Sequence, residues 1–241
     1  MTSVFRHILG RHQRSPVWSD LAPVRDELFG PERLEHHARS LAAAQPDTPR
    51  PRAVLPLHAR LNDNATVLLA AYRASATELE SGRSVVPAAE WLLDNYHTIA
   101  ETYRHLTRDL SPAFLRSLPR GQFQPVAEPI PRVLALAWDY AAMTDGDLRE
   151  RSFADFIAGA QQVDWLTIGE LWSLPSMLRY ALLLRMLRLS DETERARRGR
   201  REANAAMDRL MAMDEPGPAD FDQAVPGPAL QNAAFVAQVI Y

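Results

Sequence analysis

Apolar side chains recur every three or four positions along most of the chain, which is the spacing of one face of an α-helix. The clearest seam spans residues 88–110, and a second spans residues 57–79. Gly82 follows the second seam as a stop signal, and Pro87 opens the next helix, where its missing N–H costs no hydrogen bond. The short turn between Gly82 and Pro87 predicts that these two helices form an antiparallel hairpin.

The same spacing, with proline and glycine at the ends, predicts the remaining helices. One of them, residues 167–189, is apolar on most of its faces, so we expect it to be the most buried helix and to be covered by its neighbours. The sequence therefore predicts an all-α fold, a bundle of about eight helices with no sheet, in which helix 87–110 packs against helix 167–189. The other expected helices cover residues 31–45, 131–143, 153–160 and 229–241, with an arginine-rich helix after Asp191.

Proline-rich stretches divide the chain. Residues 1–29 lack a sustained period and are expected to form a weakly ordered arm before a helical domain at 30–215. An internal boundary is expected near 118–131, which holds four prolines and a glycine, and residues 216–228 are expected to be a linker. The last helix, 229–241, has no stop signal, so we expect either a terminal lid or a piece of something longer.

Composition narrows the function classes. The 241-residue chain is 46% hydrophobic with a formal net charge of −3, which argues against nucleic acid as a partner, because phosphate binding needs clustered cations. It has no cysteine, which fits a reducing compartment, and all 27 of its basic Lys/Arg residues are arginine. The most apolar stretch, 168–187, holds Glu170, Arg179 and Arg185, each costing roughly 2.5–3.5 kcal/mol at the centre of a membrane helix. We therefore expect no membrane span.

The densest polar constellation is a stripe on helix 87–110, formed by Glu90, Asp94, His97 and Glu101. Positions i, i+4, i+7 and i+11 lie on one helical face, and two carboxylates with an imidazole could hold a divalent metal or transfer protons. The same stripe could be an inter-helix network or a solvated face. We favour the solvated face, because metal sites in bundles usually draw ligands from several helices. The sequence predicts no catalytic residue, metal or cofactor.

Two further patterns stand out. Thr167 and Glu170 have the spacing of a capping box, in which each residue bonds to the other's backbone N–H. Aromatic residues at helical spacing could form a platform on which sugars stack, but side chains in such positions usually belong to the core, which is the interpretation favoured here. They are Trp91, Tyr96, Tyr103, Trp138, Tyr140, Trp165 and Trp172.

Three stretches, residues 87–97 (PAAEWLLDNYH), 166–179 (LTIGELWSLPSMLR) and 130–137 (IPRVLALA), resemble the N-terminal region of bacterial cyclic β-1,2-glucan synthases. The resemblance extends over roughly residues 29–241. Members of that family are very large inner-membrane enzymes that polymerise glucose from UDP-glucose and cyclise the product. Their transferase and phosphorylase-like segments follow the region matched here.

The resemblance implies a non-catalytic helical module that scaffolds or regulates a downstream UDP-glucose-dependent glucosyltransferase. Its expected partners are the downstream catalytic and membrane domains of the same parent chain, and its expected location is the cytoplasmic face of the inner membrane. Two alternatives remain open. One is a stand-alone carboxylate or metal enzyme that uses the polar stripe, and the other is a glycan-binding module.

Overall fold

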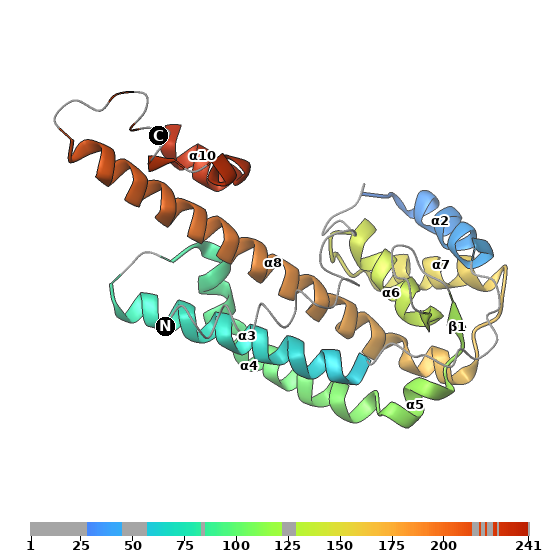
Figure 1. Ribbon diagram of the computed structural model, residues 1–241. Coiled ribbons are helices and arrows are strands. Elements are labelled where there is room, and N and C mark those ends of the chain that lie inside the picture. The colour runs from blue at the N-terminus through green and yellow to red at the C-terminus, as the bar shows by residue number, and fades with distance from the viewer. Residues whose placement is uncertain are drawn as a thin grey trace. The chain divides into compact units, whose positions relative to one another are not determined.

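The structure is a computed structural model that describes residues 28–44, 57–82, 85–121, 129–213, 217, 220, 224, 225 and 227–240. Helices dominate these residues, which confirms the all-α fold (Figure 1). Most of the expected arm at 1–29 and of the expected linker at 216–228 lies outside the described residues. The helices are α2 (Pro31–Ala44), α3 (Leu57–Glu80), α4 (Pro87–Asp109), α5 (Pro112–Ser117), α6 (Arg132–Met143), α7 (Glu150–Gln161), α8 (Ile168–Met211) and α10 (Ala233–Ile240), with a 3-10 helix η1 (Gly227–Gln231).

The prediction that the fold contains no sheet is wrong at one place, where two short strands pair. Strands β1 (Arg120–Gly121) and β2 (Ile130–Pro131) pair antiparallel at the two ends of the expected irregular crossing. Strands of two residues are too short to show an alternating pattern, so the sequence carried no signal for them. The Arg120 guanidinium stabilises the ladder, because it donates to the backbone carbonyls of Leu115 (3.0 Å) and Pro129 (3.3 Å). Burial lowers the pKa of the Arg120 guanidinium.

The sequence Ser111-Pro112 both ends one helix and starts another. Helix α4 ends at Asp109, as expected, because Ser111 precedes a proline and is therefore disfavoured in the helical conformation. Ser111 then caps α5, because its hydroxyl accepts a hydrogen bond from the backbone N–H of Phe114 at 3.3 Å. Helix α5 is only six residues long and was not predicted.

Helices α3 and α4 form the expected hairpin (Figure 1), and side chains of the first part of α8 bond to both. The rings of Tyr72 on α3 and Tyr96 on α4 are stacked, with centroids 4.5 Å apart. From α8, the Tyr180 hydroxyl donates to the backbone carbonyl of Leu57 at 3.2 Å, and the Ser176 hydroxyl donates to Asp109 at 3.2 Å. Helix α4 therefore contacts α8, as the sequence predicted.

The most enclosed helix is α6, and not the helix of residues 167–189 that the sequence favoured. Every residue of α6 except Arg132 and Asp139 is buried. By contrast, Ile168 and Trp172 at the start of α8 are 75% and 83% exposed. High apolar content alone could not distinguish a helix covered on all sides from one with an uncovered apolar end.

Helix α8 continues without a break past Asp191, where the sequence suggested a new helix. The chain forms two compact units, residues 1–188 and 189–241. The second unit has its own small core of Ala203, Ala206, Val225 and Phe235. Its arginines form ion pairs along α8, including Arg195 with Asp191 and Arg197 with Glu194.

Helices α2 and α7 approach closely at Gly159. A Cβ atom added there would lie 2.7 Å from the backbone oxygen of Glu35. We expect Gly159→Ala to lower the free energy of unfolding by about 1–2 kcal/mol, because the clash with backbone outweighs the roughly 1 kcal/mol gain in helix propensity. Chemical denaturation measures this. Ala158→Leu, at an exposed position beside it, should change stability by less than about 0.5 kcal/mol, and equal losses for both variants would contradict the close approach.

Candidate functional site

The polar stripe lies on the solvent-exposed face of α4. Glu90, Asp94, His97 and Glu101 are all exposed. The nearest polar contacts of its members are local: Thr98 to His97 at 3.2 Å, and His105 to Glu101 at 3.9 Å. Within the described part of the chain, no group of three or more histidine and carboxylate side chains is close enough to hold a metal ion. The stripe is thus arranged as a solvated face.

Five of the seven aromatic residues fall into two groups, and Tyr96 and Tyr103 are half-buried. Trp138 and Tyr140 on α6 are 3% and 0% exposed and belong to the core, as expected. The same expectation is wrong for Trp91, Trp165 and Trp172, which are 52%, 79% and 83% exposed. Helical spacing identifies a shared face but does not show whether another element covers it, so the sequence could not separate the two groups.

Two of the motifs that carried the family resemblance meet in one ion pair, between Arg132 at the start of α6 and Glu170 in the first turn of α8. The Arg132 Nε donates to one carboxylate oxygen of Glu170 at 2.6 Å, and its Nη2 donates to the other at 3.0 Å. Glu170 is fully buried, and the Arg132 side chain is 16% exposed. This forked geometry satisfies both oxygens and holds the two helix starts together.

The same carboxylate completes the capping box. Its Oε2 accepts from the backbone N–H of Thr167 at 2.9 Å, and the Thr167 hydroxyl accepts from the backbone N–H of Glu170 at 3.3 Å. Arg132 also pairs with the exposed Asp164 and donates to the backbone carbonyl of Trp165 at 2.8 Å. We call the set Arg132, Asp164, Thr167 and Glu170 the clamp. It fixes the backbone that leads into α8.

The electrostatics of the clamp keep Arg132 charged. Its hydrogen bonds to Glu170 raise the pKa of the Arg132 guanidinium, although burial acts in the opposite direction. Because Glu170 is buried and takes bonds from both Arg132 and Thr167, its carboxylate is occupied by structural partners. The clamp is suited to positioning the segment around Trp165 and not to proton transfer.

An apolar surface adjoins the clamp. Trp165, Ile168, Leu171 and Trp172 are each at least 38% exposed, and the first, second and fourth are 75% or more exposed. We call these four residues the docking patch. Exposed tryptophans gathered at one helix end mark an interaction surface more often than a free one. The clamp holds the patch in place through the carbonyl of Trp165.

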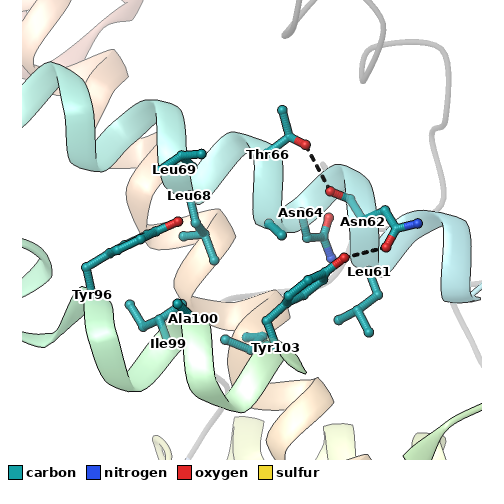
Figure 2. A pocket seen from close by; sticks show the side chains of 12 residues that line it. Leu61, Asn62, Asn64, Thr66, Leu68, Leu69, Tyr96, Ile99, Ala100 and Tyr103 are labelled. Atoms are coloured by element: carbon teal, nitrogen blue, oxygen red, sulfur yellow. Dashed lines mark hydrogen bonds between the residues drawn. The ribbon is translucent and has the colours of Figure 1, made fainter. Parts of the chain in front are cut away.

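A pocket of about 340 Å³ lies between α3 and α4, with Leu183 of α8 in its lining. Asn62, Asn64 and Thr66 reach it from α3, and Tyr96 and Tyr103 reach it from α4 (Figure 2). The Tyr103 hydroxyl donates to the side-chain oxygen of Asn62, and the Thr66 hydroxyl donates to the Asn62 carbonyl. Among the residues that the structure describes, none of those lining the pocket is charged.

The fold and these features define an all-α module that presents an apolar patch and a neutral pocket. No protein-family model matches the chain. Over 158 residues, 66% of the chain, it is 40% identical to the cyclic β-(1,2)-glucan synthase NdvB of Rhizobium meliloti (strain 1021). The chain is therefore related to a segment of that synthase, which confirms the resemblance based on the three motifs. It spans only 6% of the synthase's length.

Sequence reasoning missed the long-range pairs that connect the helices. Besides Arg132 and Glu170, the described residues include a pair between His37 on α2 and Asp139 on α6, with His37 Nε2 2.6 Å from the carboxylate. They also include Arg185 on α8 with Asp145 at 2.9 Å. The only signal in the sequence was a charged residue within an apolar helix, such as Glu170 or Arg185. None of the described helices is both long and apolar enough to cross a membrane.

Proposed function

We propose that the chain is a non-catalytic helical module of a cyclic β-(1,2)-glucan synthase-like protein. This module scaffolds or regulates the UDP-glucose-dependent glucosyltransferase of the same protein. The observation that carries the proposal is the docking patch, held next to the buried Arg132–Glu170 pair that joins two of the family motifs. The proposed location is the cytoplasmic face of the inner membrane.

The partner that best fits the patch is another part of the same protein. The related synthase is far longer than this chain, so most of such a protein lies outside the segment matched here. The four residues of the patch are apolar and carry no positive charge, whereas an anionic lipid surface attracts clustered basic side chains. A protein surface with an apolar centre and a polar rim matches this chemistry.

A chimera tests the proposal: the chain replaces the matching segment of the Rhizobium meliloti synthase. We expect the double variant Trp165→Ser/Trp172→Ser to lower glucan formation from UDP-glucose by roughly tenfold or more, because exposed aromatic side chains dominate interface energies. The measurement is incorporation of labelled glucose by membranes that contain equal amounts of each chimera. In the isolated chain the same double variant should change stability by less than about 1 kcal/mol, because both side chains are exposed.

The matched control is Trp91→Ser on α4, a tryptophan that is 52% exposed and lies outside the patch. It should leave glucan formation unchanged. Full synthesis by the double variant, at normal protein levels, would contradict the proposed role of the patch.

A further inference from the structure

The pocket between α3 and α4 has a lining that indicates the class of its ligand. Its polar groups are the amides of Asn62 and Asn64 and the hydroxyls of Thr66, Tyr96 and Tyr103, all of them neutral. Leucine, isoleucine and alanine side chains form the rest. A charged ligand would lose its hydration without gaining a counter-charge, whereas a purely hydrocarbon ligand would leave the Asn64 amide without a partner.

One polar group in the lining lacks a partner within the described part of the chain. Asn64 is 6% exposed, and its side-chain nitrogen is buried without a hydrogen bond. The neighbouring Asn62 differs, because its side-chain oxygen accepts from Tyr103. A buried amide N–H without an acceptor is destabilising, and a ligand oxygen would supply the acceptor once the Asn64 side chain turns its nitrogen toward the pocket.

The tyrosines are held in fixed positions around this space. Tyr96 stacks on Tyr72, with 28° between the ring planes, and Tyr103 is held by its bond to Asn62. In Figure 2 the side chains of Asn64 on α3 and Tyr103 on α4 lie close together, and Tyr96 lies farther along α4 beside Leu68. Aromatic rings with nearby amides and hydroxyls are the groups that bind a sugar, whose ring has both apolar C–H and hydroxyl groups.

We infer that this pocket binds a neutral sugar, with the Asn64 amide donating to a sugar oxygen and with Tyr96 and Tyr103, about two helical turns apart on α4, packing against different parts of the ligand. The volume of about 340 Å³ lies at the lower end for small-molecule sites, which suits roughly one or two pyranose rings. The neutral lining and the unpartnered amide carry the inference. Only the choice of glucose-based probes rests on the proposed function.

Titration of the 241-residue chain with sophorose, the β-1,2-linked glucose disaccharide, tests the inference by NMR. We expect the Asn64 side-chain amide signals to shift with saturating behaviour. Glucose 6-phosphate should bind at least tenfold more weakly, because its charge has no partner in the lining. The variant Asn64→Leu should bind sophorose at least tenfold more weakly, while its thermal unfolding midpoint stays equal or rises, because an unpartnered amide is replaced by an apolar side chain of similar size.

The matched control is Asn95→Leu on α4, outside the pocket lining, which should bind sophorose normally. The inference is overturned if sophorose causes no saturable shift, if glucose 6-phosphate binds equally well, or if Asn64→Leu keeps full binding. A lower unfolding midpoint for Asn64→Leu would also count against it, because the amide would then have a structural partner. None of these outcomes bears on the docking patch, which is scored by glucan formation with the tryptophan double variant.

Discussion

Replacing Arg132 with alanine is expected to lower the free energy of unfolding by about 3–5 kcal/mol. The substitution leaves the Glu170 carboxylate fully buried without its cation, and it removes the donor that holds the Trp165 carbonyl. Breaking a buried pair in this way costs more than the pair contributes when it is intact, because the remaining charge is neither solvated nor neutralised. Urea denaturation, monitored by tryptophan fluorescence, measures the difference in free energy of unfolding between the variant and the parent.

Two companion variants separate burial from charge. Arg149→Ala removes an arginine whose side chain is 77% exposed in its pair with Asp147, and it should cost at most about 1 kcal/mol. The double variant Arg132→Met/Glu170→Leu replaces both charges with apolar groups and should recover most of the loss, apart from about 1 kcal/mol for the lost cap. Equal losses for Arg132→Ala and Arg149→Ala would contradict the buried pair.

Replacing Phe156 with alanine should destabilise the chain by a similar amount, about 3–5 kcal/mol. Phe156 is fully buried on α7, and its ring packs against the ring of Tyr140, with centroids 5.4 Å apart. Removing the ring loses apolar burial and leaves a cavity between α6 and α7 that the neighbouring side chains cannot fill completely.

A graded series checks that the loss arises from packing. Phe156→Leu keeps most of the apolar volume and should cost clearly less than Phe156→Ala in chemical denaturation. Asp155→Ala, at the exposed position beside it, should stay within about 0.5 kcal/mol of the parent. If Phe156→Ala unfolded at the same denaturant concentration as Asp155→Ala, the placement of α7 on this core would be wrong.

Most of the helical architecture could be predicted from local signals in the sequence. Pro87 and the apolar seam after it place α4, and the Ser111-Pro112 pair ends it, because the relevant hydrogen bonds and steric clashes lie within a few residues. The same reasoning placed the capping box, whose hydrogen bonds join Thr167 and Glu170. Such features depend on spacing alone.

The candidate sites could not be predicted in the same way, because they depend on which helices meet. Nothing in the spacing of Arg132 and Glu170, 38 positions apart, shows that they pair. Helical period likewise places Ile168 and Trp172 on one face, but only the packing shows that this face is uncovered. The composition of the polar stripe from Glu90 to Glu101 is compatible with a metal or proton-transfer site, yet its side chains are exposed.

The clamp and the docking patch belong to one arrangement. Arg132 is anchored in the core on the most enclosed helix, and its guanidinium reaches both the first turn of α8 and the carbonyl of Trp165. A patch whose backbone is held by a buried ion pair loses little backbone freedom when it binds, which favours affinity. The stability of the clamp and the function of the patch are therefore expected to fall together in Arg132→Ala.

The most direct test of this account is photo-crosslinking from position 172 in the chimeric synthase. A photoreactive benzophenone amino acid in place of Trp172 should crosslink to another part of the same synthase, and mass spectrometry of the digested protein identifies the joined peptides. We expect crosslinks into the glucosyltransferase segment from position 172 and none from position 91 on α4. Crosslinks from position 172 only to lipid, or equal crosslinks from both positions, would contradict it.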